Sequence, residues 1–149
     1  AEADSTAGNL QKTFTLADGK VIPSVGLGTW LLTDPDRHPD IICKAITENG
    51  YRFLDCATMY ANEEIVGQAV QKAISQGAVE RKDLFIVTKL WATDFHDPEA
   101  ALRTSLAKLQ TDYVDCFLIH WPTGFFAEDP ANRVPVHVLW RKFESLADQ

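Results

Sequence analysis

Four polar side chains of complementary chemistry are candidates for an active site: Asp55, Tyr60, Lys89 and His120. A phenol is a weak acid with a pKa of about 10, and an ammonium held against its oxygen stabilises the phenolate and lowers that pKa. We expect Lys89 to act on Tyr60 in this way, while Asp55 keeps the ammonium charged and oriented. A neutral His120 would hydrogen-bond a substrate oxygen. Such a set is suited to protonating a developing alkoxide.

Each of these residues also has an ordinary structural interpretation. An aspartate at a strand end commonly caps a helix or turn, a tyrosine after a strand packs, a lysine can lie along a sheet surface, and a strand-end histidine is often structural. Their common position favours chemistry instead. All four lie at, or just after, the ends of consecutive predicted strands. Because the carboxyl ends of parallel barrel strands meet at one mouth, we expect the four side chains to converge there.

The hydrophobic pattern predicts a hairpin followed by alternating strands and helices. Asp18-Gly19 lies between two apolar arms, which indicates a hairpin over Phe14–Pro23. The predicted strands are Ser24–Leu27, Phe53–Asp55, Leu84–Lys89 and Val114–His120. The predicted helices are Asp40–Asn49, Glu63–Gln76, a helix capped by Asp97 with Leu102, Leu106 and Leu109 on its inward face, and Val136–Ala147. Apolar strands separated by helices indicate an α/β fold with a parallel sheet.

The domain organisation that follows is a flexible tail over residues 1–12 and four βα units over residues 13–149. Four units are half of a (β/α)₈ TIM barrel, whose usual length is about 250 residues. A half barrel leaves two strand edges and an apolar sheet face uncovered. We therefore expect the chain to be truncated, clipped or incomplete, and its partner to be the missing C-terminal half of the same protein.

Composition narrows the functional classes. The 149 residues include 14 Lys and Arg against 21 Asp and Glu, a formal net charge of −7, and 46% are hydrophobic. This is typical of one globular domain, and the acidic balance argues against binding nucleic acid or anionic membranes. No apolar run approaches the roughly 20 residues that span a bilayer. The three cysteines and four histidines lack metal-site spacing, and no secretory signal opens the sequence, so we expect no metal and a cytoplasmic location.

Several segments resemble the aldo-keto reductases, which are NAD(P)H-dependent carbonyl reductases built on a (β/α)₈ barrel. Residues 50–67, GYRFLDCATMYANEEIVG, are similar to that family's signature around its catalytic aspartate and tyrosine. VTKLW around Lys89 and LIHWP around His120 resemble its lysine and histidine segments, and GLGTW at 26–30 resembles the loop after its first strand. The resemblance runs from about Phe14 to the last residue. Leu31 departs from it, since many members have a polar residue there.

The resemblance implies roles by position. Tyr60 would be the general acid, tuned by Lys89 and Asp55, and His120 would orient the carbonyl. The residues implied to contact the nicotinamide end of the cofactor are Gly28, Thr29 and Asp55. The residues implied to line an aromatic substrate pocket are Trp30, Tyr60, Trp91, His120 and Trp121. The cofactor would be NADPH, with NADH as the alternative, because the residues that distinguish them lie outside these 149.

The leading hypothesis is therefore an enzyme that reduces aldehydes or ketones to alcohols by hydride transfer. The alternatives are a non-catalytic binding or regulatory module of the same fold and an inactive truncated fragment. The complete set of four polar residues favours the enzyme, because an inert module has no need of all four. A Rossmann dehydrogenase is a weak interpretation, since Gly26-Leu27-Gly28 lacks the third glycine of the dinucleotide fingerprint.

Overall fold

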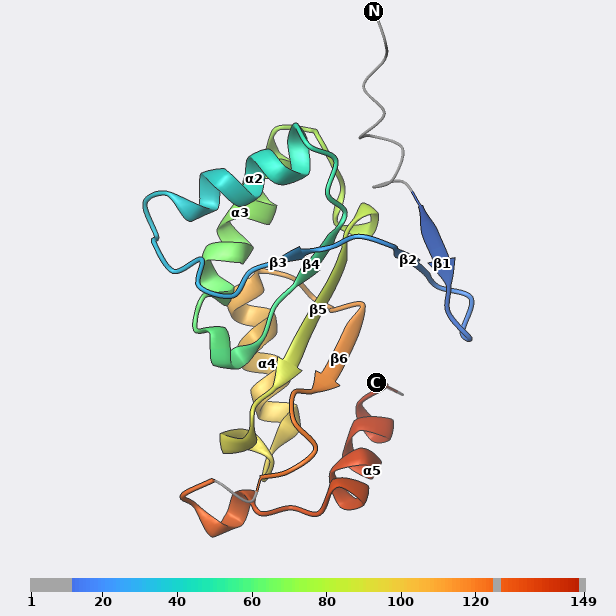
Figure 1. Ribbon diagram of the computed structural model, residues 1–149, viewed down its shortest axis with the longest axis vertical. Helices are drawn as coiled ribbons and strands as arrows, with labels where there is room; N and C mark the ends of the chain where they lie inside the picture. Colours follow the sequence, from blue (N-terminus) through green and yellow to red (C-terminus); the bar gives the residue numbers. More distant parts are fainter. Residues whose placement is uncertain (1–11, 125–126, 148–149) are drawn as a thin grey trace, which may run out of the picture.

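A parallel sheet of four strands forms the centre of the molecule (Figure 1). The computed structural model describes residues 12–124 and 127–147, so the predicted tail lies, apart from Lys12, outside the described residues. The strands lie in the order β3 (Leu27–Gly28), β4 (Phe53–Asp55), β5 (Phe85–Leu90) and β6 (Cys116–Ile119). The helices are α2 (His38–Thr47), α3 (Glu63–Ser75), α4 (Pro98–Leu109) and α5 (Val136–Ala147). Short 3₁₀ helices are η1 (Thr58–Tyr60), η2 (Arg81–Asp83), η3 (Ala92–Asp94) and η4 (Pro130–Asn132).

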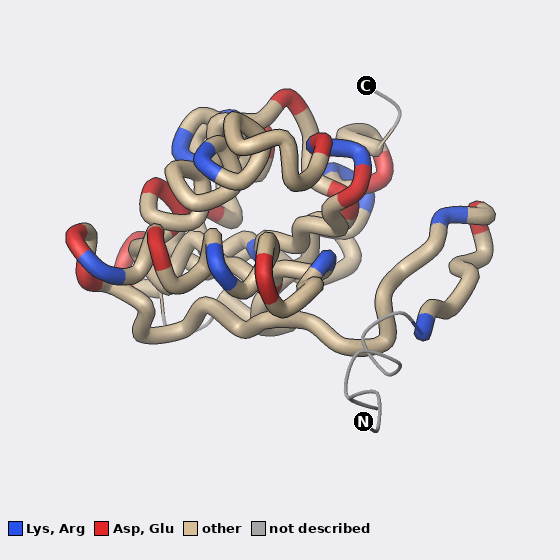
Figure 2. Tube along the Cα trace, turned by 90° about the horizontal axis from the view of Figure 1, so that it is seen from above, with Lys and Arg blue, Asp and Glu red and all other residues tan. Residues whose placement is uncertain are grey.

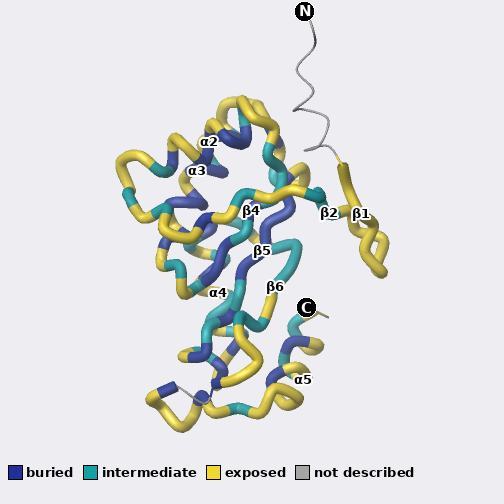
Figure 3. The backbone as a smooth tube through the Cα atoms, in the orientation of Figure 1, coloured by how far each residue is buried: buried dark blue, intermediate teal, exposed yellow. Residues whose placement is uncertain are grey.

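The predicted hairpin is present as β1 (Thr13–Thr15) paired antiparallel with β2 (Val21–Pro23). Gly19 has a φ of 85° at the turn, a left-handed conformation that glycine adopts at little cost. The hairpin projects away from the four-stranded sheet (Figures 1 and 2), and its residues are mostly exposed (Figure 3). It therefore contributes little to the core of the described residues.

The core lies between the sheet and the helices that cover one of its faces. Figure 1 shows α2, α3 and α4 along one side of the sheet, and β5 is buried for most of its length (Figure 3). One apolar cluster joins α2 and α3 to the sheet and includes Ile42, Leu54, Val66 and Ile86. A second joins β5 to α5 through Leu90 and Leu139. Burial of these side chains on one face leaves the strands' carboxyl ends free to present polar groups.

The predicted parallel sheet and the four βα units are confirmed, with two strand corrections. The first strand was predicted at Ser24–Leu27 but lies at Leu27–Gly28, because its register pairs just these two residues with Leu54 and Asp55 of β4. The last strand is shorter than predicted and begins at Cys116. The residue before it, Asp115, bonds Ile86 twice: its backbone N–H donates to the Ile86 carbonyl at 2.9 Å, and its carboxylate accepts from the Ile86 N–H at 2.8 Å.

The inward face of α4 was also predicted wrongly in part. Its N-cap is Asp97 as expected, since the carboxylate accepts from the Ala100 N–H at 3.1 Å. Leu109 is buried, but Leu102 and Leu106 are only half-buried. The helix instead buries Ser105, whose hydroxyl donates to a carboxylate of α3.

That buried carboxylate joins three elements behind the sheet. Glu63, the first residue of α3, is 2% exposed and accepts from Thr88 Oγ1 of β5 at 2.6 Å and from Ser105 Oγ of α4 at 3.1 Å. Burying a carboxylate is costly unless hydrogen bonds compensate, and a helix N-terminus also favours negative charge. Glu63 therefore fixes α3 and α4 against the strand residue that precedes Lys89.

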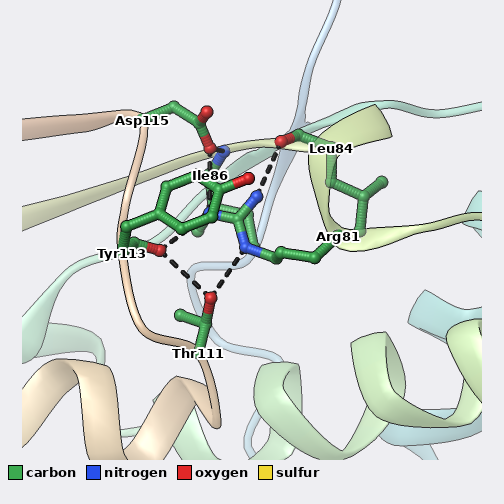
Figure 4. A network of polar contacts seen from close by, with 6 residues as sticks. All are labelled: Arg81, Leu84, Ile86, Thr111, Tyr113 and Asp115. Carbon is green, nitrogen blue, oxygen red and sulfur yellow. Dashed lines mark hydrogen bonds and ion pairs between the residues drawn. The ribbon is translucent and has the colours of Figure 1, made fainter.

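A second polar network holds the amino ends of β5 and β6 together (Figure 4). The Arg81 guanidinium donates to Thr111 Oγ1 at 2.8 Å, to the Tyr113 carbonyl at 2.8 Å and to Asp115 Oδ2 at 2.9 Å. It also lies 4.0 Å from the centre of the Tyr113 ring. Because the same Asp115 oxygen accepts from Ile86, the network sets the register of the two strands, whose far ends carry Lys89 and His120.

Charged residues of both signs occur along the described helices. Lysine and arginine are interspersed with aspartate and glutamate over the helices (Figure 2). Among the described residues, no helix has both the length and the apolar character needed to cross a membrane.

The contact between α3 and α4 gives a first prediction. A Cβ at Gly67 would overlap the Lys108 carbonyl oxygen and lie 2.8 Å from the Leu109 carbonyl carbon. We expect Gly67→Ala to lower the free energy of unfolding by about 1–3 kcal/mol, because the backbone of α4 must move away. Chemical denaturation measures this. The control is Gly28→Ala, where an added Cβ meets nothing within 4 Å. A Gly67→Ala protein that is more stable, as at an open helix position, would contradict the close contact.

Candidate active site

The Lys89 ammonium is the centre of the polar cluster at the carboxyl ends of the strands. It lies 2.8 Å from Asp55 Oδ1, donates to the Cys56 carbonyl at 2.8 Å and donates to the Tyr60 hydroxyl oxygen at 3.1 Å. Its side chain is 13% exposed. An ammonium has three donors and no acceptor, so all three are used here. The phenol oxygen of Tyr60 is therefore an acceptor toward Lys89, and its own O–H is available to another acceptor.

Tyr60 is held over Lys89 by the short helix η1. The chain makes one 3₁₀ turn here, and the Thr58 hydroxyl donates to the backbone carbonyl of Lys89. The next residue, Ala61, has a φ of 53°, which lets the chain reverse into α3. This turn places the phenol beside the end of the neighbouring strand.

His120 completes the group from the next strand along. Its backbone N–H donates to the Leu90 carbonyl at 3.1 Å, which extends the pairing of β5 and β6 by one residue. The ring centre lies 5.7 Å from that of Tyr60, and the buried Nδ1 has no hydrogen-bond partner among the described residues. Burial, and then the positive charge of Lys89, hold the pKa of His120 below its ordinary value, while Asp55 opposes them. Both influences favour the neutral form of the imidazole.

Three tryptophans lie at this end of the sheet, two of them in ring contact with the polar group and the third with its neighbouring tryptophan. Trp30 lies edge-on to Tyr60 with ring centres 4.9 Å apart. Trp91 contacts His120 at 5.2 Å and Trp121 at 6.3 Å. Trp30 is 48% exposed and Trp121 is 54% exposed. Flat apolar side chains that remain open to solvent beside polar groups are suited to bind the body of a small organic ligand.

The residues predicted to contact a nicotinamide lie on the β3–β4 side of the cluster. Gly28 is exposed and pairs in register with Asp55. Thr29 is fully buried, and both its N–H (3.1 Å) and its hydroxyl (2.9 Å) donate to the Asp55 carbonyl. Thr29 thus fixes the backbone of Asp55. Gly28 has no side chain, so its exposed backbone is accessible beside Asp55.

Cys56 lies next to Asp55 but contributes its carbonyl rather than its thiol. The side chain is fully buried, and burial raises the pKa of the Cys56 thiol to about 12. A thiol of this acidity stays protonated at neutral pH and is a poor nucleophile. The described residues also contain no group of three or more His, Cys, Asp or Glu side chains that could hold a metal ion.

Two residues of this site were not singled out from the sequence: Thr58 and Asn62. Thr58 gave no signal, because its partner lies 31 residues away in sequence. Asn62 precedes a helix, a position typical of an N-cap, but its side chain does not cap α3. Its amide instead donates to the Thr29 carbonyl at 2.6 Å and to the Leu32 carbonyl at 3.1 Å.

A cavity of about 640 Å³ lies at the other end of the sheet. It separates the hairpin from the amino ends of the strands and is lined in part by Thr13, Pro23, Arg52 and Phe85. It is open to solvent, and its lining contains none of the four converging polar residues. We therefore locate the candidate site by its side chains, at the carboxyl ends of the strands.

The parallel βα units, with polar residues at the carboxyl ends of their strands, fit part of a (β/α) barrel. Residues 24–148 match the model of the Aldo/keto reductase family, and the chain belongs to that family.

Individual relatives agree with this assignment. The chain is 43% identical over 151 residues to an aldose reductase of Encephalitozoon cuniculi, covering 92% of this chain and 49% of that protein. It is 42% identical over 164 residues to an NAD(P)H-dependent D-xylose reductase of Kluyveromyces lactis, covering 94% and 49%. The crystal structure of a Bombyx mori aldo-keto reductase in complex with NADP matches with a TM-score of 0.79 and 36% identity, over 90% of this chain and 46% of that one. The chain thus spans about half the length of these relatives.

The environment of His120 gives a second prediction. We expect its ring to titrate with a midpoint below 6.5. In Lys89→Met the midpoint should rise, because the positive charge that disfavours imidazolium is gone and only burial then opposes the effect of Asp55. Histidine ring chemical shifts followed against pH measure the midpoint in the unaltered protein and in Lys89→Met. The spectrum of His120→Gln assigns the resonance. Lys72→Met, an exposed lysine paired with Asp40 on the helical side, is the control. A midpoint above 6.5 in the unaltered protein would show that the imidazole is not held neutral.

Proposed function

We propose that the protein containing this chain reduces an aldehyde or ketone to an alcohol with NADPH or NADH, and that Tyr60 gives the proton. The observation that carries the proposal is the Lys89 ammonium, which lies 3.1 Å from the Tyr60 oxygen while paired with Asp55 at 2.8 Å. The relatives support the class of reaction, since they are an aldose reductase and an NAD(P)H-dependent D-xylose reductase. The Bombyx mori protein was crystallised with NADP.

The proton transfer follows from the direction of the hydrogen bonds. Lys89 can only donate, so it binds a lone pair of the Tyr60 oxygen and leaves the phenolic proton free to be given away. As that proton leaves, negative charge develops on the phenol oxygen, and the ammonium stabilises it. Asp55 holds the ammonium in place and balances its charge in a site with little exposure. A neutral His120 can hydrogen-bond the carbonyl oxygen without competing as a proton donor.

The residues on the β3–β4 side fit a nicotinamide ring. Gly28 is exposed and an added Cβ there would meet nothing within 4 Å, so a flat ring can lie against its backbone next to Asp55. Gly28 and Asp55 would hold the nicotinamide end, and Thr29 would support them through its two bonds to the Asp55 carbonyl. When bound, NADPH or NADH supplies the hydride that adds to the carbonyl carbon.

The substrate would be a small carbonyl compound with an apolar or extended body. Trp30, Trp91 and Trp121 border the proton-donating group and can cover such a body while His120 and Tyr60 bind its oxygen. The aldose and xylose reductases among the relatives are named for carbonyl substrates of this size.

We further infer that this sheet is completed by more βα units, supplied by the rest of the same protein. The outer edges of β3 and β6 have no neighbouring strand in the described part of the chain, and Leu118 of β6 is 42% exposed. Unpaired edges of a parallel sheet promote association. The matched relatives are about twice as long.

Intact mass tests this completion. We expect the product of the gene to have about twice the mass of these 149 residues, because the Encephalitozoon cuniculi relative is matched over 49% of its length. A gene product of only 149 residues that is a stable monomer would contradict it.

We also place the protein in a reducing compartment such as the cytoplasm. The support is that Cys43, Cys56 and Cys116 are all free, and that burial raises the pKa of each thiol. Cell fractionation of the native protein tests the location.

The proton-donor role gives a further prediction. We expect Tyr60→Phe to lower kcat for aldehyde reduction by about 10²–10⁴-fold, the usual contribution of a general acid. Affinity for NADPH should stay nearly unchanged, because the residues proposed to hold it are on β3 and β4. Steady-state absorbance at the cofactor wavelength measures kcat, and fluorescence titration measures the affinity for NADPH. Tyr113→Phe, at the far end of the sheet, is the matched control. Near-normal turnover by Tyr60→Phe would show that Tyr60 does not donate the proton.

A further inference from the structure

The turn that carries Trp30 has an uncommon backbone conformation. The Leu32 N–H donates to the Thr29 carbonyl at 3.1 Å, which closes a tight turn over residues 29–32. Leu31 lies inside it with a φ of 67°, a left-handed conformation that is unfavourable for a bulky residue. Its side chain is 67% exposed, so packing of Leu31 does not hold the turn in this shape. The restraint must come from elsewhere.

Asn62 supplies that restraint from the start of α3. Its side chain is 1% exposed, and Nδ2 donates to the Thr29 carbonyl at 2.6 Å and to the Leu32 carbonyl at 3.1 Å. Both N–H groups of one amide are thus used on the two ends of one turn. Asparagine before a helix usually accepts from the helix N–H groups, but this side chain makes no such bond. The amide acts on the distant loop rather than on its own helix.

The restrained turn determines where Trp30 lies. Thr29, on one side of Trp30, is buried and bonded to the Asp55 carbonyl through its N–H and its hydroxyl. Leu32, on the other side of the turn, is held by Asn62. Between these anchors the Trp30 ring meets Tyr60 edge-on at 4.9 Å and an interplanar angle of 61°.

We propose that Asn62 is a positioning residue, which holds the 29–32 turn so that Trp30 forms one wall of the substrate mouth against Tyr60. The proposal rests on the proposed carbonyl reduction for its effect on substrates. It assigns to Asn62 a role in selecting the substrate body, exerted through Trp30, and no contact with substrate or cofactor.

Asn62→Asp tests the role with little change of shape. The carboxylate cannot donate and would face two carbonyl oxygens, so the turn should move and take Trp30 with it. We expect KM for a bulky aromatic aldehyde to rise about tenfold, because a small misplacement of a positioning group is amplified at the site. KM for a two-carbon aldehyde and kcat for both substrates should change by less than about threefold, since Tyr60, Lys89 and His120 keep their own contacts. Asn49→Asp, an exposed asparagine after α2, is the control.

A double-mutant cycle separates this role from a general loss of stability. In a Trp30→Ala background, Asn62→Asp should change KM for the bulky aldehyde by less than about twofold, because the wall through which it acts is already gone. If the KM changes caused by Asn62→Asp and by Trp30→Ala multiply in the double variant, the two residues act independently and the proposal is overturned. Leu31→Gly, which relieves the left-handed backbone, should restore at least part of the KM lost in Asn62→Asp.

Hydrogen exchange gives a readout that needs no activity. If Asn62→Asp does not fold, Asn62→Ser, which keeps one donor, replaces it in the kinetic measurements and in hydrogen exchange. In the folded variant the Leu32 amide should exchange about tenfold faster, while the Cys56 amide, bonded to Val87, should not change. Unchanged exchange at Leu32 would overturn the tether. An unaltered gene product that reduces no carbonyl would reject the proposed function, while the exchange result would still decide whether Asn62 holds the turn.

Discussion

The arrangement at the strand ends depends on one largely buried ammonium. Lys89 has little exposure to water, so its charge and its three donors must be satisfied by the protein. Three acceptors do this: the carboxylate of Asp55 at the end of β4, the carbonyl of Cys56 that follows it, and the phenol oxygen carried by η1. The requirement is stringent because a buried donor without a partner is costly. Because the buried ammonium needs these three contacts, it also fixes the position of Tyr60, the proposed proton donor.

The scaffold meets this requirement by fixing the sheet at its amino ends and on the face that the helices cover. At the amino ends, the Arg81 guanidinium and the Asp115 carboxylate set how β5 and β6 pair. Behind the sheet, the Glu63 carboxylate binds Thr88, the residue before Lys89, and so joins α3 and α4 to the same strand. None of these groups touches the mouth, yet each restrains a strand that ends in it. Parallel strands in fixed register then deliver Asp55, Lys89 and the residue after β6 to one edge.

Charge and burial separate the roles of groups that lie within a few ångströms of each other. His120 is kept neutral by burial and by the nearby ammonium, so it can accept or donate a hydrogen bond without carrying charge. Burial keeps the Cys56 thiol protonated, which leaves its carbonyl as its contribution. The phenol of Tyr60, the proposed proton donor, has an adjacent positive charge that would stabilise the loss of its proton. This division agrees with membership of the Aldo/keto reductase family.

The sequence alone determined the order of elements and the residue types at the strand ends. Period-two and period-3.6 patterns, the Asp18-Gly19 turn and the Asp97 cap identified the hairpin, the four strands and the helices, since these signals are local. Residue type and position at the predicted strand ends marked Asp55, Tyr60, Lys89 and His120, and the family resemblance then implied a role for each.

Only the tertiary structure decided which of the side chains meet and in which direction each hydrogen bond runs. It shifted β3 to Leu27–Gly28, turned Ser105 inward and gave Asn62 a partner about 30 residues away, because pairing and packing, not local pattern, choose among such contacts.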